Sequence, residues 1–352
     1  MKLFSCQSCG QILYFENFRC EKCGHVLGYL PDRATISALE PEPGDLWRAL
    51  AGGRRYRFCK NQQWGVCNWL VPWRSKEEFC AACRHNHVIP DLSVPENENY
   101  WRRLEAAKHR LFYTLLRLSL PLANRVDDSA HGLAFDFLAE APLTHGQSVM
   151  IGHDNGLVTL AIREADDSER ERVRSAMGEP YRTLLGHFRH EVGHYFWDVL
   201  VRDAGRTDTF RAVFGDESAD YNAALQTHYA QGAPADWQQN YVSTYASAHP
   251  WEDFAETWAH YLHIVDTLET AGAFGMQIKV RPGRRTRMSA AIDFDPHAET
   301  DTARLIDAWL PVTFAMNSLN RSMGHNDLYP FVLAPAVIAK IDFVSKLVHG
   351  GI

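Results

Sequence analysis

The sequence predicts an α+β protein that is mostly helical, contains a small sheet and begins with two small cysteine-rich modules. Three observations predict this fold class. All 8 cysteines fall between Cys6 and Cys83. Long segments further along the chain repeat apolar residues at helical spacing, and two short β-rich runs flank an Asn-Gly turn signal. With 352 residues of ordinary globular composition, the chain is long enough for two or three domains.

The first cysteine set has the spacing of a zinc ribbon. Two Cys-x2-Cys pairs lie close together, and glycine follows each pair. The four residues are Cys6, Cys9, Cys20 and Cys23. Two tight turns that each offer two thiolates complete the tetrahedron that Zn²⁺ prefers, and no position is then left open for water. We therefore predict a zinc-ribbon module with a structural zinc ion over residues 1–30.

A second group of four cysteines lies within residues 55–90. Its members are Cys59, Cys67, Cys80 and Cys83. The last two form a Cys-x2-Cys pair, and clustered cysteines in a chain without an export signal favour a metal over disulfides. We predict a second zinc-ribbon module with a structural zinc ion here, in which His85 or His87 could replace one cysteine. We interpret the stretch EPEPGD (40–45) between the two sets as a linker.

The N-terminal segment lacks the apolar core of a signal peptide, and its cysteines begin at once. No apolar run in the sequence is as long as a membrane-spanning helix. These two observations predict a cytoplasmic protein without a membrane partner.

Beyond residue 98, the apolar pattern predicts a single larger domain over residues 98–352. Helical spacing covers 100–120, 179–203, 251–269, 301–320 and 334–348, and 164–177 is either a helix or an ordered loop. Pro180 fits the first turn of the 179–203 helix. Strands are expected over 148–153 and 157–162, on either side of the turn residues Asn155 and Gly156.

The strongest functional signal is the run HEVGH at 190–194. His190 and His194 are four residues apart, so both imidazoles leave one side of a helix and can reach one ion. In a His-Glu-x-x-His pattern the two histidines bind Zn²⁺. Glu191 is turned by about 100° from the first histidine, so it is placed to accept a proton as general base. The alternative is a pair of exposed or internally bonded histidines.

A catalytic zinc ion needs a third protein ligand and keeps one position for water. The run WEDFAE (251–256) offers Glu252 and Glu256, which share one helical face. One carboxylate can bind the metal while the other accepts a hydrogen bond from a ligand histidine. From these residues alone both assignments stay open. Four histidines remain fallback ligands: His228, His249, His260 and His263.

At this point the chain resembles a known family. The runs EPYRTLLGHFRHEVGHYFWDVLV, SVMIGHDNGLVTLAIREADD and PWEDFAETWAHYLHI resemble bacterial zinc-binding metallopeptidases that carry an N-terminal zinc ribbon. HEVGH followed by EDFAE is more distantly similar to the gluzincins, including the catalytic domain of anthrax lethal factor. The resemblance implies Glu252 as the third ligand, Glu256 as the acceptor behind His190, and Tyr245 as a donor to the oxyanion. It also implies a zincin-like domain that binds its substrate along an edge strand of the hairpin.

We therefore predict a zinc-dependent metallopeptidase with one catalytic and two structural zinc ions, acting on a peptide or protein substrate. The alternative is a non-catalytic or nucleic-acid-recruited protein whose ribbons bind nucleic acid or a protein partner. Trp64, Trp69 and Trp73 lie near arginines and could stack on a nucleic-acid strand if they are exposed. The N-terminal third is only mildly basic in a chain of net charge −7, so a normal solvated surface is the simpler interpretation.

Overall fold

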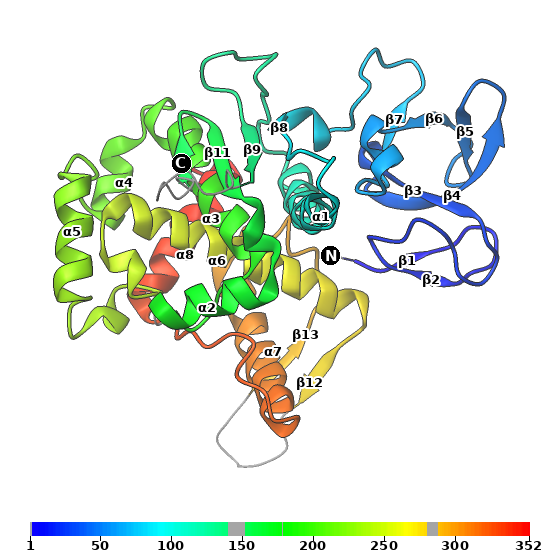
Figure 1. Ribbon diagram of the computed structural model, residues 1–352. Coiled ribbons are helices and arrows are strands. Elements are labelled where there is room, and N and C mark those ends of the chain that lie inside the picture. The colour runs from blue at the N-terminus through cyan, green and yellow to red at the C-terminus, as the bar shows by residue number, and fades with distance from the viewer. Residues whose placement is uncertain (1, 140–151, 178, 280–287) are drawn as a thin grey trace. The chain divides into compact units, whose positions relative to one another are not determined.

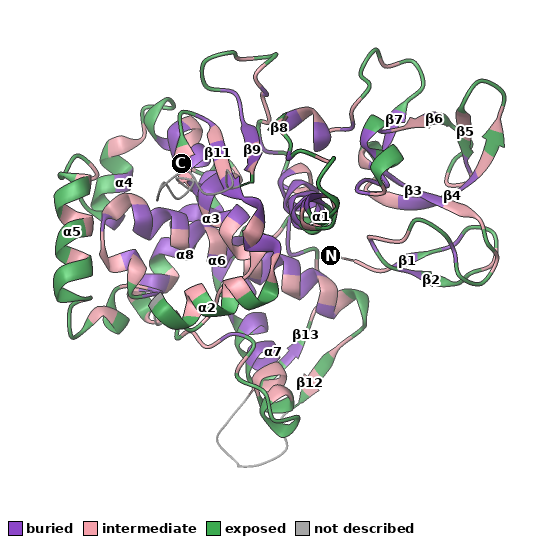
Figure 2. Ribbon diagram, viewed as in Figure 1, coloured by how far each residue is buried: buried purple, intermediate pink, exposed green. Residues whose placement is uncertain are grey.

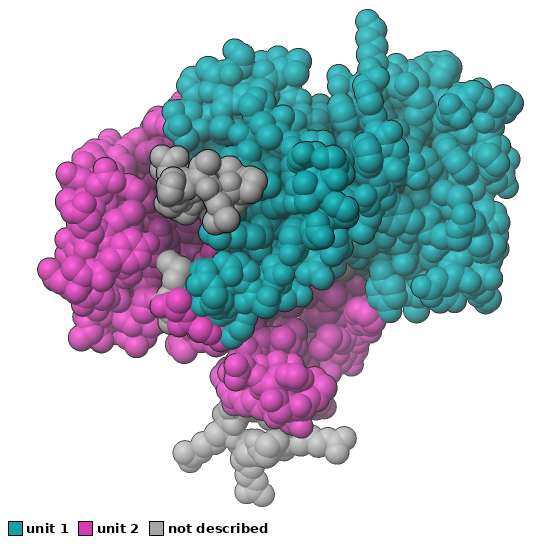
Figure 3. Space-filling view, in the orientation of Figure 1, with its two compact units in different colours: residues 1–173 teal, residues 174–352 magenta. Residues whose placement is uncertain are grey.

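The computed structural model describes residues 2–139, 152–177, 179–279 and 288–352 (Figure 1). The chain divides into two compact units, residues 1–173 and residues 174–352 (Figure 3). None of the helices in the described part of the chain has the length and hydrophobicity that crossing a bilayer requires. The arginine-rich run at 281–287 and the start of the predicted hairpin at 148–151 lie outside the described residues.

The first unit begins with a short ribbon of two strands and continues with a five-stranded antiparallel sheet in the order β3-β4-β5-β6-β7. The strands are β1 (Phe4–Ser5), β2 (Ile12–Leu13), β3 (Val26–Leu30), β4 (Thr35–Glu42), β5 (Leu46–Ala49), β6 (Arg55–Phe58) and β7 (Leu70–Pro72). The predicted linker at 40–45 is therefore wrong. Pro41 pairs with Trp47 across a β4–β5 hairpin, and Gly44 and Asp45 form its turn with positive φ angles. The Pro, Gly and Asp residues of this stretch correctly indicated a turn. The turn joins two paired strands of one sheet instead of linking two modules.

One aromatic cluster joins both cysteine-rich segments of this unit to helix α1 (Pro95–Arg117). The Tyr29 ring lies 4.9 Å from that of Phe15 and 4.6 Å from that of Trp69, between ring centroids. Tyr113 of α1 completes the cluster, with its ring 5.5 Å from Phe15. Because aromatic side chains bury large apolar areas, this cluster forms a core that neither short cysteine module could build alone.

A four-stranded mixed sheet follows in the first unit, in the order β10-β11-β9-β8. Its strands are β8 (Asn86–Val88), β9 (Ala134–Leu138), β10 (Gly152–Asp154) and β11 (Leu157–Ala161). The predicted hairpin is confirmed, since β10 and β11 pair antiparallel and its turn residues Asn155 and Gly156 both have positive φ. Within the described residues β10 is an edge strand, whereas β11 lies between two neighbours. That the substrate binds along an edge strand of this hairpin stays a prediction.

The second unit is built around helix α6, and buried residues concentrate on its central helices (Figure 2). Helix α6 packs against α3, α4, α7 and α8. Helix α2 (Asp167–Met177) spans the boundary between the units along the chain. The elements that follow are α3 (Leu184–Trp197), α4 (Thr207–Phe214), α5 (Tyr221–Gln231), α6 (Pro250–Ala273), β12 (Gln277–Lys279), β13 (Ser289–Ala291), α7 (Thr302–Ser322) and α8 (Pro335–Val348). All the predicted helices occur, and the fold is α+β and mostly helical.

Helix α3 begins at Leu184, five residues after the predicted start at 179. Thr183 has an extended backbone, and its hydroxyl accepts a hydrogen bond from the Gly186 N–H at 3.0 Å. This is an N-cap, which satisfies a backbone donor that has no partner inside the helix. Pro180 therefore precedes the helix, and its predicted place in the first turn is wrong. At the other end the helix continues into one π-helical turn over Asp198–Arg202.

Helices α3 and α6 pack closely at Gly193, the second variable position of the HEVGH run. A Cβ atom built on Gly193 would lie 3.0 Å from the Ala255 Cα and 3.3 Å from the Trp258 Cβ. Backbone atoms cannot move away as a flexible side chain can. Glycine at this position therefore sets the distance between the two helices that carry the HEVGH and EDFAE runs.

We expect Gly193→Val to lower the free energy of unfolding by about 1–3 kcal/mol, because the added side chain forces α3 away from α6. Urea denaturation of the full chain, followed by tryptophan fluorescence, measures the change. Ala230→Val, at an exposed position of α5, is the control for adding valine to a helix, and should change stability by less than about 1 kcal/mol. Equal effects of the two substitutions would contradict the close-approach argument.

Candidate metal centres

The second unit brings two histidines of α3 and one glutamate of α6 to a common point. The Nε2 atoms of His190 and His194 are 3.2 Å apart. The Glu252 Oε2 atom lies 3.0 Å from the first of these nitrogens and 3.5 Å from the second. Zinc bonds of about 2.0 to 2.1 Å in a tetrahedron place ligand atoms about 3.3 Å from one another. The three donor atoms therefore fit a zinc ion in both chemistry and spacing.

Burial strengthens this fit. The Glu252 side chain is 1% exposed, and its Oε2 atom accepts no hydrogen bond from the described residues. A buried carboxylate oxygen is costly unless a cation or a donor compensates it. Burial alone would raise the pKa of Glu252, but the charge of His194 and the nearby His190 hold that pKa well below its usual range. The carboxylate is therefore ionised and faces the position that a cation would occupy.

Glu256, one helical turn after Glu252, lies behind His190. Its Oε1 atom is 2.8 Å from the His190 Nδ1 atom, and its Oε2 atom accepts a hydrogen bond of 2.7 Å from the Ser243 hydroxyl. A carboxylate at Nδ1 fixes the proton there and leaves the Nε2 lone pair for a metal. Burial lowers the pKa of His190, but the two glutamates raise it well above its usual value, so a metal that binds the Nε2 atom displaces a proton from it. The geometry thus separates the two candidate glutamates, with one facing both Nε2 atoms and the other behind the first histidine.

Glu191 lies beside the three donor atoms but does not belong to their cluster. Its Oε1 atom is 3.2 Å from Nε2 of His187, one helical turn earlier on α3. Burial would raise the pKa of Glu191, but the hydrogen bond from His187 and the charge of His190 lower it to about 2. Glu191 is therefore an ionised carboxylate next to the centre. His187 was missed from the sequence, although its spacing of four residues from Glu191 could have indicated the pair.

Two tyrosines reach the same centre. Tyr245 begins a short 3-10 turn (Tyr245–Ser247), and its ring centroid lies 5.9 Å from that of His190. Tyr221, the first residue of α5, donates its hydroxyl to the Glu252 Oε1 atom at 2.5 Å. Burial and the charge of Glu252 raise the pKa of both phenols, so both stay protonated. Nothing in the sequence marked Tyr221, because tertiary folding brings α5 to α6.

The four fallback histidines have other contacts in the structure, and none joins the donor cluster among the described residues. His249 caps α6, with its Nδ1 atom 3.1 Å from a backbone N–H of the first turn. The His260 Nδ1 atom is 2.6 Å from the Tyr329 hydroxyl, and the His263 ring packs against the same tyrosine at 5.2 Å. The His228 ring lies 6.1 Å from that of Tyr245. Through these contacts Tyr329 packs against α6.

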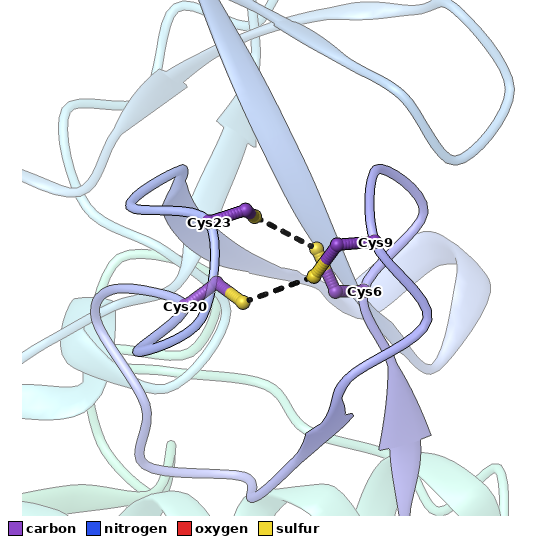
Figure 4. Close-up of side chains that lie close together, drawn as sticks. All are labelled: Cys6, Cys9, Cys20 and Cys23. Atoms are coloured by element: carbon purple, nitrogen blue, oxygen red, sulfur yellow. Dashed lines mark hydrogen bonds between the residues drawn. The ribbon is translucent and has the colours of Figure 1, made fainter.

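The first cysteine set forms a second candidate centre, in the first unit (Figure 4). The Sγ atoms of Cys6 and Cys23 are 3.6 Å apart, as are those of Cys9 and Cys20. Zinc–sulfur bonds of about 2.3 Å in a tetrahedron place sulfur atoms about 3.8 Å apart. The four thiols therefore surround a position of the right size for zinc.

The second cysteine set is also brought together, and all four of its residues are buried. The Cys67 and Cys80 Sγ atoms are 3.8 Å apart, and the backbone N–H of Cys83 donates to the Cys80 Sγ atom at 3.4 Å. The two histidines suggested as substitutes point elsewhere. His85 contacts the Leu133 carbonyl oxygen at 2.8 Å, and His87 contacts a carboxylate oxygen of Asp136 at 2.8 Å.

A different histidine, His109 of α1, contacts this cysteine set. Its Nε2 atom lies 3.3 Å from the Cys67 Sγ atom and 3.7 Å from the Cys83 Sγ atom. Its Nδ1 atom is held 2.6 Å from the Glu105 carbonyl oxygen. No sequence pattern indicated this contact, because His109 lies 26 positions after Cys83, the nearest cysteine along the chain.

The three tryptophans noted in the sequence do not form one exposed surface. Trp69 is fully buried in the aromatic core, so it cannot stack on a nucleic-acid strand. Trp64 and Trp73 are 39% and 43% exposed, and the Arg74 guanidinium lies over the Trp73 ring. The stacking alternative is therefore excluded for Trp69.

Comparison with known proteins agrees with this site. Residues 97–347 match a family described as putative zinc-binding metallo-peptidase. The chain belongs to this family. Residues 3–94 match a zinc-ribbon domain, in agreement with the paired cysteines. Membership in the metallopeptidase family supports zinc binding and a peptidase function.

Relatives of this metallopeptidase family member occur in mycobacteria. Proteins described as uncharacterized, from Mycobacterium bovis and Mycobacterium tuberculosis, are each 41% identical to it over 351 residues. The alignment covers 99% of this chain and 95% of each relative. No solved structure matches the chain.

We expect His109→Ala to weaken zinc retention at the second cysteine set by about 10–100-fold, the usual effect of removing a side chain that supports metal ligands. Competition with a chromogenic chelator, in the full chain, measures the change. His87→Ala is the matched control, because its side chain is 58% exposed and contacts Asp136 instead. Equal zinc retention in the two variants would show that His109 does not support the site.

Proposed function

We propose that the protein is a zinc-dependent metallopeptidase that hydrolyses peptide bonds at the centre formed by His190, His194 and Glu252. The observation that carries this proposal is the cluster of their three donor atoms, separated by 3.0 to 3.5 Å, with an ionised Glu191 beside it. Two imidazoles and one carboxylate are a common ligand set of catalytic zinc, and they leave one position for water.

The metal and the protein have separate tasks in this proposal. Zinc bound at such a centre acts as a Lewis acid and lowers the pKa of water toward neutrality. Glu191 accepts the proton of the attacking water and then delivers it to the leaving amine, which is general acid–base catalysis. Glu256 holds His190 through its Nδ1 atom, 2.8 Å away, and thereby keeps the Nε2 atom directed at the centre.

Tyr245 is the proposed oxyanion donor. Its ring lies beside His190, and burial raises the pKa of its phenol, so the hydroxyl keeps its proton at neutral pH. A neutral donor next to the position where negative charge develops stabilises the transition state more than the ground state.

The two cysteine sets are the proposed structural zinc sites. Each offers four sulfur atoms and no open position for substrate, so catalysis is assigned to the His190 centre. Small cysteine-rich modules commonly need their metal to fold. The two ions would therefore stabilise the sheets that surround the aromatic core of the first unit.

We expect Glu191→Gln to lower peptide hydrolysis by about 10²–10⁴-fold, because glutamine keeps the size of the side chain but cannot accept the proton. The zinc content should stay at the wild-type value. A fluorogenic peptide library measures turnover, and Glu96→Gln, at an exposed position, is the matched control. Full activity in Glu191→Gln would exclude this glutamate as the base.

We expect three zinc ions per chain, one for each cysteine set and one for the His190 centre. His190→Ala should retain two of these ions, since the cysteine sets do not include this histidine. Metal analysis by mass spectrometry after dialysis gives the numbers. An unchanged zinc content in His190→Ala would place the third ion elsewhere or exclude it.

A further inference from the structure

Helix α5 is an exposed helix that nevertheless reaches the candidate centre. All of its residues are described, and none is buried. Its start is fixed by Asp220, whose side chain accepts a hydrogen bond from the Ala223 N–H at 3.0 Å. The next residue, Tyr221, extends from this capped end to Glu252, 31 positions further along the chain. A capped helix end is a defined support for a side chain that must be held in one place.

The two oxygens of Glu252 have different surroundings. The Oε1 atom accepts the Tyr221 hydroxyl at 2.5 Å. The Oε2 atom faces the two histidine Nε2 atoms, at 3.0 and 3.5 Å. Rotation of the carboxylate about its last side-chain bond would exchange the two oxygens or direct both at the centre. The phenol hydrogen bond opposes that rotation.

The ring of Tyr221 is itself packed, so its hydroxyl cannot swing away easily. It lies edge-on against His249 at 5.3 Å and against Trp251 at 5.7 Å, between ring centroids. Edge-to-face contacts of this kind stabilise one orientation of the ring. The ring contacts and the helix cap therefore fix both ends of the tyrosine.

Glu256 shows the same arrangement. Its Oε2 atom accepts the Ser243 hydroxyl at 2.7 Å, and its Oε1 atom contacts His190 at 2.8 Å. Tyr221 and Ser243 both belong to the segment between α3 and α6. This long segment thus supplies one hydroxyl donor to each carboxylate of α6.

We propose that Tyr221 is a positioning residue that holds Glu252 with only its Oε2 atom directed at the metal. The inference rests on the proposed function and adds a residue to its machinery. A glutamate that offers one oxygen leaves room for water in a four-coordinate site, whereas one that offers both occupies that room. Fixing the carboxylate before the metal binds also removes an entropic cost of ordering it.

The test is Tyr221→Phe in the full chain, which removes the hydroxyl and keeps the packed ring. We expect zinc to bind the His190 centre about 10–100-fold more weakly. Competition with a chelator gives this affinity, and His190→Ala supplies the background from the two cysteine sets. Tyr229→Phe is the matched control, because this tyrosine lies on the same helix and is 63% exposed. It should bind zinc like the wild type.

Two further measurements separate positioning from a general structural role. The visible spectrum of the cobalt-substituted His190 centre should change in Tyr221→Phe and not in Tyr229→Phe, because it reports the geometry of the ligands. With zinc kept at both cysteine sets and the His190 centre empty, the thermal unfolding temperature of Tyr221→Phe should stay within a few degrees of the wild type. Wild-type zinc affinity with an unchanged cobalt spectrum in Tyr221→Phe would overturn the proposal.

The outcome is also distinguishable from failure of the proposed function. Weaker zinc binding in Tyr221→Phe supports the positioning role even if the wild-type protein hydrolyses no peptide. Peptide hydrolysis by the wild type together with unchanged zinc affinity in Tyr221→Phe overturns the role of Tyr221 and leaves the metallopeptidase proposal intact.

Discussion

The candidate centre depends on how closely α3 and α6 approach one another. Gly193 has no side chain at the crossing, so the backbone of Ala255 lies where a Cβ atom would be crowded at 3.0 Å. His190 and His194 lie on either side of this glycine along α3, and Glu252 precedes Ala255 by less than one helical turn. Backbone packing therefore brings the three side chains close enough for donor atoms 3.0 to 3.5 Å apart.

The same close packing brings three carboxylates and two imidazoles together at the candidate centre. Glu191, Glu252 and Glu256 are all ionised groups with lowered pKa values, held within two helices that exclude water. Histidine contacts compensate part of this charge, and hydroxyl donors from the segment between α3 and α6 satisfy individual oxygens. Because the Oε2 atom of Glu252 receives none of those donors among the described residues, it points to where positive charge is required.

In the first unit, the two cysteine sets also depend on packing between distant segments. One aromatic core is shared by the two cysteine sets, the five-stranded sheet and α1, so neither set forms an independent domain. His109 extends from α1 to the second set and contacts Cys67 at 3.3 Å. Metal binding at that set is thereby linked to the helix that supplies Tyr113 to the core.

The sequence by itself determined the features that depend on neighbouring residues. Helical periodicity placed every long helix, Asn155 and Gly156 marked the hairpin, and the spacing of HEVGH put two imidazoles on one side of α3. Tertiary structure decided everything that requires distant segments to meet. It brought Tyr221 to the His190 centre and His109 to the second cysteine set, and it made a hairpin of the stretch at 40–45. It also separated Glu252 from Glu256, which share one helical face but contact different atoms of His190 and accept different hydroxyl donors. Local spacing fixes direction along one helix, whereas distances between helices depend on packing that no short run of residues encodes.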